Sequence, residues 1–413
     1  MKSRSLIAML RARSHHLRDI GSNTLVTYIG MALSLVSAPL VVQAVGADGR
    51  GVLAGSFALV QVLTYVAPLG LTRGMAMQLQ RRREVSVWGL IVMTGMGILA
   101  AAMVLVLAPF LSGGDDRIAF GMQIAALLLP LQGVANLGAS LSIMSTRTTT
   151  YNLIRASTLI VPSGVQVLLF VLGALTLPLA YAAMLLGTVL AVVVGTVAAI
   201  IAIRGAHNAP VPWGFSLRTW ASTLSESLAS RLDIAALTMF APASAVGVYA
   251  IAMTCSNAAG GVTQAINRVG LVKFVHEPED SKDSLRSIGR VGVIASTVSG
   301  VLVLALVSLL WNVLFGAEFG LLPLLVALLL VGRSLQDQWA LRIHYETARE
   351  SAGVVSAASL CGLVTLVLVI TTLVLLQQVN EVSVALAFCA GVMGRMAAYA
   401  LLTRGRMSKE SLS

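Results

Sequence analysis

The stretch Leu217–Phe240, LRTWASTLSESLASRLDIAALTMF, decides the fold class of this 413-residue chain. It is long enough for a helix that crosses a bilayer, which needs about 20 residues. It nevertheless carries Glu226, Arg231 and Asp233 near its middle, where a charge is costly unless it faces water or a partner. On one continuous helix Glu226 and Asp233 share a face and Arg231 points away from both. We therefore expect this helix to line a cavity inside a helical bundle.

The composition is that of a polytopic membrane protein. Hydrophobic residues make up 57% of the chain and charged residues 11%, and the mean hydropathy is +0.89. The sequence predicts an all-α fold of twelve transmembrane helices, over residues 24–46, 51–72, 86–110, 119–144, 154–173, 177–203, 217–240, 244–271, 289–312, 320–341, 351–377 and 382–403. The cysteines lie in apolar runs without metal-ligand spacing, so we expect neither a metal site nor disulfides.

The basic residues indicate the topology. Of the 28 Lys and Arg residues, the short loops on one predicted side hold only Arg50 and Arg117, and three more lie within predicted spans. The other side holds the rest, so by the positive-inside rule both termini are cytoplasmic and the chain is a multi-pass protein of the cell membrane. The net charge of +11 is thereby explained, and nucleic acid is not an expected partner.

The two halves of the sequence resemble each other. Gly51-Val-Leu-Ala follows the first span as Gly247-Val-Tyr-Ala follows the seventh, and Leu111-Ser-Gly-Gly parallels Phe315-Gly-Ala-Glu. Six spans per half imply parallel repeats, which place a substrate site between the halves near the midplane. The predicted organisation is a basic amphipathic cytoplasmic segment (1–22), a six-helix lobe (23–204), a cytoplasmic linker (205–216), a second six-helix lobe (217–404) and a cytoplasmic tail (405–413).

The stretch Leu232-Asp233-Ile234, followed by Gly247-Val248-Tyr249-Ala250, resembles the Wzx-type lipid-linked oligosaccharide flippases. These belong to the MOP transporter superfamily, with the multidrug MATE exporters and the lipid II flippases. The resemblance implies two MATE-like lobes around a central cavity. It also implies a substrate, a polyprenyl-pyrophosphate-linked oligosaccharide, which is moved to the outer leaflet for polysaccharide biosynthesis. The first half departs from the pattern, because Gly51-Val-Leu-Ala-Gly-Ser matches the family's opening only loosely.

Ionisable residues at membrane depth are candidates for binding the substrate or a coupling ion. Arg333 and Asp337 are four residues apart and are expected to pair, either to hold a helix in place or to take part in transport. With Glu226, Arg231, Asp233 and Arg395 they sum to zero charge. We expect Asp233 or Glu226 to carry the coupling proton. Arg231 or Arg395 is expected to bind the pyrophosphate, because a guanidinium matches phosphate oxygens and stays charged.

The first half carries neutral polar residues at the corresponding depth. Gln132 and Asn136 occupy places like those of Arg333 and Asp337, and Gln43 lies in the first span. They are candidate sugar ligands or ordinary interhelical contacts. Arg73 and Arg268 end the second and eighth spans; they are either phosphate contacts at the cytoplasmic mouth or topology anchors.

Other functions fit the sequence less well. An enzyme acting on the same lipid carrier would need a catalytic motif or a large outward loop, and the sequence has neither. An ion-coupled MATE-type exporter of small organic cations is the alternative, although aromatic residues are only 5% and the buried charges balance. No nucleotide-binding loop or cofactor motif occurs, so the energy is expected from an ion gradient, proton or sodium, or from the substrate gradient.

Overall fold

The computed structural model describes residues 2–144, 148–276, 281–348 and 352–410, and within these ranges it does not describe every side chain. The helices of the first half are α1 (Lys2–Val66), α2 (Leu71–Arg82), α3 (Val87–Leu111), α4 (Asp116–Ala126), α5 (Leu129–Met144), α6 (Thr148–Val171) and α7 (Leu177–Ile203). The second half contains α8 (Trp213–Ala229), α9 (Leu232–Phe240), α10 (Ala243–Ala259), α11 (Gly261–His276), α12 (Ser281–Phe315), η1 (Ala317–Phe319), α13 (Leu322–Ala348), α14 (Ala352–Leu375) and α15 (Glu381–Glu410). Two short strands, β1 (Glu84–Val85) and β2 (His207–Asn208), form a parallel ribbon.

Helices occupy all twelve predicted ranges, and the protein is an integral membrane protein. Within the described ranges, seven helices are long and apolar enough to cross a membrane. The number rises to nine if two bent pairs, α4–α5 at 55° and α10–α11 at 45°, each count as one span. Helices α2 and α8 are short, with 12 and 17 residues, and α13 carries Arg333 and Asp337 in its apolar part. The total of twelve crossings therefore stays a prediction.

Helix α1 contains the first predicted span and residues 51–66 of the second. Its backbone departs from helical geometry at Gly46, with φ 72° and ψ 179°, a conformation that is open to glycine and strained for other residues. At its other end α1 begins at Lys2, so the predicted N-terminal segment continues the first span rather than forming a separate helix. Nothing between residues 18 and 25 forces a break, because this stretch contains no proline.

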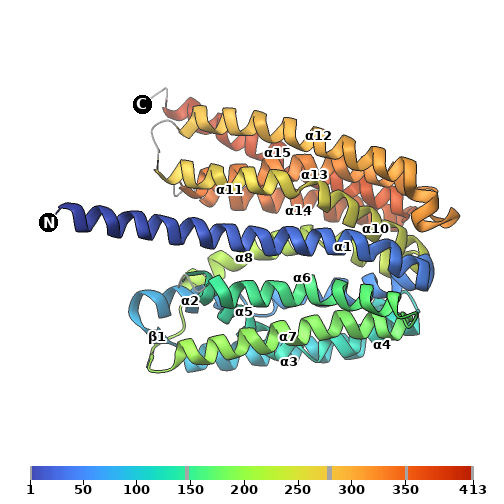
Figure 1. Ribbon diagram of the computed structural model, residues 1–413, viewed down its shortest axis with the longest axis horizontal. Coiled ribbons are helices and arrows are strands. Elements are labelled where there is room, and N and C mark those ends of the chain that lie inside the picture. Colours follow the sequence, from blue (N-terminus) through green and yellow to red (C-terminus); the bar gives the residue numbers. More distant parts are fainter. Residues whose placement is uncertain (1, 145–147, 277–280, 349–351, 411–413) are drawn as a thin grey trace.

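The helices gather into two bundles, with α1 and α8 lying between them in the view of Figure 1. Helices α2–α7 form the first bundle and α10–α15 the second. Each bundle has its own apolar core: Val104, Ile118 and Met122 belong to the first, and Tyr249 and Phe319 to the second. Helix α1 packs extensively on both α6 and α10, so it joins the two bundles.

The contact between α1 and α10 depends on two glycines. A Cβ added to Gly51 would collide with the carbonyl oxygen of Ala243, and one added to Gly247 would collide with that of Ala47. These glycines are the residues that the sequence comparison matched between the halves. The two helices therefore meet backbone to backbone at one end of the molecule, where any side chain would separate them.

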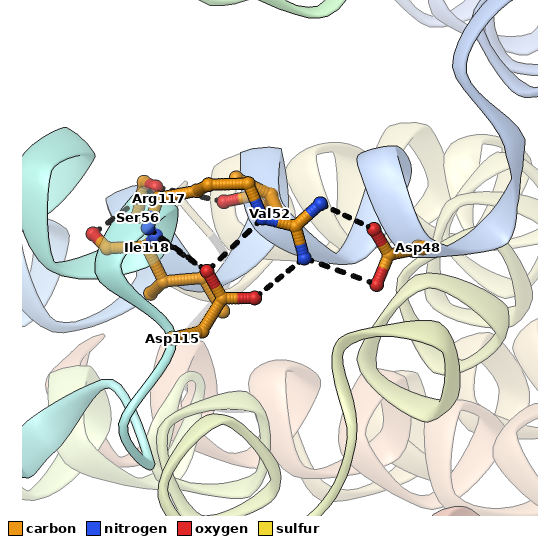
Figure 2. Close-up of polar contacts among 6 residues, drawn as sticks. All are labelled: Asp48, Val52, Ser56, Asp115, Arg117 and Ile118. Carbon is orange, nitrogen blue, oxygen red and sulfur yellow. Dashed lines mark hydrogen bonds and ion pairs between the residues drawn. The ribbon is translucent and has the colours of Figure 1, made fainter.

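Arg117 joins α1 to the loop that precedes α4 (Figure 2). Its Nη1 lies 2.7 Å from Asp48 Oδ2, and its Nη2 lies 2.7 Å from Asp115 Oδ2. Asp115 also caps α4 by accepting the Arg117 backbone N–H. The hydrogen bonds from Arg117 hold the pKa of Asp115 below its usual range. Exposed pairs of this kind contribute little individually, so their main effect is to orient the loop that precedes α4.

The segment between the two halves is tied to the first bundle. His207 N–H donates to the Arg83 carbonyl at 2.9 Å, and Ala209 N–H donates to the Val85 carbonyl at 3.0 Å. Farther on, Trp220 Nε1 donates to the carbonyl of Val66 at 2.8 Å. The predicted linker and the start of α8 are thus held against the first bundle, whereas the end of α8 reaches the second.

We predict that replacing Gly51 by alanine destabilises the protein by about 1–3 kcal/mol, the usual cost of overpacking. The physical reason is that the Ala243 carbonyl cannot move without shifting α10. Thermal unfolding of the detergent-solubilised protein measures the effect. Gly95 in α3 is the matched control, because a Cβ there meets nothing within 4 Å. Equal melting temperatures for Gly51→Ala and Gly95→Ala would show that the α1–α10 contact is not tight.

Candidate functional site

The helix predicted over Leu217–Phe240 is broken at its charged centre. Helix α8 ends at Ala229, and α9 starts at Leu232. Arg231 between them has φ −142° and ψ −9°, which is outside helical geometry. The expectation of one continuous helix was therefore wrong. Because the break separates Glu226 from Asp233, the two acids do not share a helical face but belong to different local environments.

Asp233 lies in the first turn of α9 and has no exposed surface. Its Oδ2 accepts a hydrogen bond of 2.7 Å from the hydroxyl of Tyr249, which is equally buried in the core of the second bundle. These two residues are the most distinctive members of the sequence pattern described above. The contact explains why they occur together: the phenol satisfies a carboxyl group that has no access to solvent.

Glu226 belongs to a cluster drawn from four helices. Its Oε1 lies 3.7 Å from Arg395 Nη1 of α15 and accepts hydrogen bonds from Ser359 of α14, at 3.1 Å, and Trp339 of α13, at 3.4 Å. The side chain of Glu226 is 39% exposed, whereas that of Arg395 is 3% exposed. Gly362 makes room for the arginine, since a Cβ there would lie 2.7 Å from Arg395 Cβ.

The Arg395 guanidinium is incompletely satisfied. Its Nε and Nη1 are buried and have no hydrogen-bond partner in the described part of the chain. A buried cation is stable only with a counter-charge, and the one it has here is Glu226. Whether the charge of Arg395 is neutralised thus depends on the ionisation of Glu226, whose carboxyl group is partly open to solvent.

The predicted pairing of Arg333 and Asp337 on α13 is confirmed. Arg333 Nε lies 3.3 Å from Asp337 Oδ1, and Arg333 Nη1 donates to Asn257 Oδ1 of α10 at 3.0 Å. The hydroxyl of Thr263 donates to Asp337 Oδ2. Asn267 Nδ2 donates to the Asp337 backbone carbonyl at 2.9 Å. The pair therefore connects α13 to α10 and α11.

A cavity of about 210 Å³ opens beside this pair, between α11 and α13. It is lined by Gln264, Asn267, Arg333, Gln336, Asp337, Ala340 and His344. A water molecule takes about 30 Å³ in the liquid, so the cavity has room for an ion and a few waters. It is too small for an oligosaccharide in this conformation.

The remaining predicted site residues are scattered. Gln43 Nε2 donates to the Leu314 carbonyl of α12 at 3.2 Å, and Asn136 Nδ2 donates to the Thr64 carbonyl of α1 at 3.2 Å. Both are therefore interhelical contacts in this structure. Gln132 is partly buried and Arg73 is exposed. The side chain of Arg268 lies outside the described residues.

The last predicted site residue is Arg231, and several residues that contact the site were not predicted. The Arg231 guanidinium is partly buried and has no hydrogen bond or ion pair within the described part of the chain. The sequence analysis did not single out Asn257, Thr263, Asn267, Trp339 or Ser359. A signal for two of them existed: Thr263 and Asn267 are four residues apart in an apolar helix, a spacing that puts them on one face. Trp339 and Ser359 gave no signal, because one tryptophan or serine in a membrane helix is ordinary.

The sequence matches no protein-family model and no curated protein sequence. The fold does match solved structures. A lipid II flippase MurJ in an inward closed conformation is similar with a TM-score of 0.73 at 11% identity, over 92% of this chain and 87% of that one. An inward-facing MATE multidrug transporter of the MOP superfamily has a TM-score of 0.66 at 13% identity, over 93% and 96%. A MOP-superfamily transporter from Pyrococcus furiosus has a TM-score of 0.54 at 14% identity, over 94% and 95%. The chain therefore has the fold of the MOP-superfamily transporters.

We predict that Arg333→Gln and Asp337→Asn each destabilise the protein by about 2–4 kcal/mol, because each leaves a charge in a poorly hydrated site. The double variant should lose clearly less than the sum of the two. Unfolding of the purified variants in detergent gives the coupling energy between the two residues.

The control is the pair Arg286–Asp283, whose side chains are 77% and 87% exposed. Its single and double variants should unfold like the unmodified protein, because water solvates either charge alone. Strict additivity at Arg333 and Asp337 would show that the two residues do not interact energetically, whatever their distance.

Proposed function

We propose that this protein is a transporter that moves a polyprenyl-pyrophosphate-linked oligosaccharide from the cytoplasmic to the outer leaflet by ion-coupled alternating access. The observation that carries the proposal is the Glu226–Arg395 pair, a half-exposed carboxyl group that controls a buried and incompletely bonded guanidinium. The fold supports it, because one structure of similar fold is a lipid II flippase. In this proposal the chain has two six-helix lobes with parallel repeats, and both termini face the cytoplasm.

The chemistry of coupling follows from the charges of this pair. While Glu226 is ionised, it neutralises Arg395, and the site has little attraction for an anion. Protonation of Glu226 removes that compensation, and a phosphate becomes the favourable partner of the buried cation. Binding of a proton and of a pyrophosphate group would then favour each other, which is the requirement for coupled transport.

Burial distinguishes the roles of the other charged residues. Asp233 is fully buried and already bonded to Tyr249, so we assign it to keeping α9 in place against α10, and the coupling role to Glu226. Arg231 lies at the α8–α9 break, and its guanidinium has no hydrogen bond to the described residues, so we assign it the first phosphate contact. Arg395, which is buried, would meet the phosphate only after a rearrangement of α8.

Access from the two sides requires the two bundles to separate at one end and then at the other. The α1–α10 contact at Gly51 and Gly247 closes one end in this structure. The two backbones can separate and meet again without any change of side-chain rotamer, because no side chains interlock there. Such a contact suits an end of the transporter that opens once in each transport cycle. The small size of the cavity beside Arg333 agrees with a closed conformation.

The alternative is an ion-coupled exporter of small organic cations, which the likeness to MATE multidrug transporters favours. For such a substrate the determinant would be Glu226 itself, as the counter-ion of the cation. Arg395 would then oppose binding, and removing its charge should strengthen the affinity for a cation. The two functions thus make opposite predictions for the same residue.

We predict that Glu226→Gln reduces export of the glycan at least tenfold. The purified variant should still bind the lipid-linked oligosaccharide. The amide imitates the protonated acid but cannot release a proton, so the cycle stalls after binding. Export is measured in a strain that depends on this transporter, and binding is measured separately on the purified protein. Glu318→Gln is the control, because Glu318 is an exposed acid in η1.

A second pair of variants tests the phosphate contact. Arg395→Gln should weaken binding of the lipid-linked oligosaccharide about tenfold or more, and Arg395→Lys should restore only part of it, since lysine keeps the charge but not the fork of donors. Normal export by Glu226→Gln would refute coupling through Glu226, and normal export by Asp233→Asn as well would refute carboxyl coupling altogether. Tighter binding of an organic cation by Arg395→Gln would favour the cation exporter instead.

A further inference from the structure

A second cavity, of about 560 Å³, lies on the first bundle between α2, α5, α6 and α7. Its walls are apolar, with Leu141 of α5, Leu153 of α6, and Val193, Val197 and Ile201 of α7 among the lining residues. Four of these side chains are about half exposed: Leu153 53%, Val193 52%, Val197 49% and Ile201 48%. Since these helices lie in the membrane, the cavity is an apolar groove open to hydrocarbon chains. None of the candidate transport residues lines it.

One end of the groove is cationic. Helix α2 finishes with Arg81 and Arg82, and the next residue, Arg83, lines the groove. Arg83 stands in left-handed geometry, with φ 54° and ψ 37°, and its backbone N–H closes the helix by bonding to the Leu79 carbonyl. The Arg83 guanidinium has no hydrogen bond or ion pair within the described ranges, although Glu84 follows it in sequence.

The cationic end is held in a fixed shape. Gln80 Nε2 donates to the Met144 carbonyl at 2.8 Å and thereby ties the end of α2 to the end of α5. The β1–β2 ribbon holds the residues next to Arg83, because the Arg83 carbonyl accepts the His207 N–H at 2.9 Å. The groove is therefore a preformed amphiphilic site, with an apolar channel within the membrane and an arginine at its mouth.

We propose that this groove binds an anionic phospholipid of the leaflet next to the α2–α3 loop, with one acyl chain along α7 and the phosphate at Arg83. The apolar walls alone would not select a ligand, because any lipid chain of the bilayer can fill them. Selectivity has to come from the charge. Each basic residue near an anionic lipid surface favours binding about fivefold.

The experiment compares lipids with identical chains bound to the purified full-length protein, by native mass spectrometry and thermal stabilisation in neutral detergent. Phosphatidylglycerol should bind about fivefold more tightly than phosphatidylcholine. Two variants should each remove this preference: Arg83→Gln, which removes the charge, and Val197→Trp, which fills the groove. The matched controls are Arg290→Gln and Val298→Trp on α12, an exposed arginine and a 56% exposed valine, which should leave it unchanged.

Three outcomes would overturn the proposal. One is equal binding of the two phospholipids, or a preference that survives both Arg83→Gln and Val197→Trp. Another is stabilisation by inorganic phosphate alone that equals that by phosphatidylglycerol, which would make the site an anion site without a lipid chain. The third is displacement of phosphatidylglycerol by equimolar polyprenyl phosphate, which would assign the groove to the carrier lipid. Because Arg83 and Val197 are exposed, folding of the variants is not at risk, and their melting temperatures without lipid confirm it.

Discussion

The whole arrangement depends on the close approach of α1 and α10. Gly51 and Gly247 allow two backbones to touch where any larger residue would hold them apart. In a membrane, helices gain little from burying apolar surface, since lipid tails are equally apolar, and close packing of small residues takes over as the main attraction. The position of the second bundle relative to the first is thus set by α1, which packs on both. The α1–α10 contact therefore also sets the geometry of the space between the two bundles.

The charged residues of the second half obey a single physical rule. Asp233, Glu226 and Asp337 have no neighbour of opposite charge on the next helical turn except where Arg333 precedes Asp337, yet each acid has found a donor in the folded structure. The cost of burying a charge is large compared with the stability of a protein. The contacts of these acids accordingly join α8 to α13, α14 and α15, α9 to α10, and α13 to α11. What distinguishes Glu226 is that its partner is more deeply buried than it is.

Much of the architecture could be predicted from the sequence. The apolar runs and their lengths predicted helices in all twelve ranges, although most of α2 lies outside them, and the i,i+4 spacing predicted the Arg333–Asp337 pair. The break at Ser230–Arg231 could not be predicted, because neither residue forbids a helix. In the fold α8 packs on both α2 and α14, whereas α9 packs on α1 and α10. The same applies to the partners of Glu226. They come from α13, α14 and α15, and the local sequence does not predict which helices will pack together. The pairing of Asp233 with Tyr249 was present in the sequence pattern, but only the fold shows that it is a hydrogen bond.

The distance along the chain between the two glycines has a consequence for biosynthesis. Gly51 emerges from the ribosome long before Gly247, and at 5–20 residues per second the delay is roughly 10–40 s. The helices of the first bundle are synthesised within this interval, and until α10 appears the face of α1 that packs on α10 has no protein neighbour. Lipid or an insertion factor must occupy that surface and then leave it. Nascent chains paused before α10 should accordingly be the species most exposed to mispairing and quality-control proteolysis.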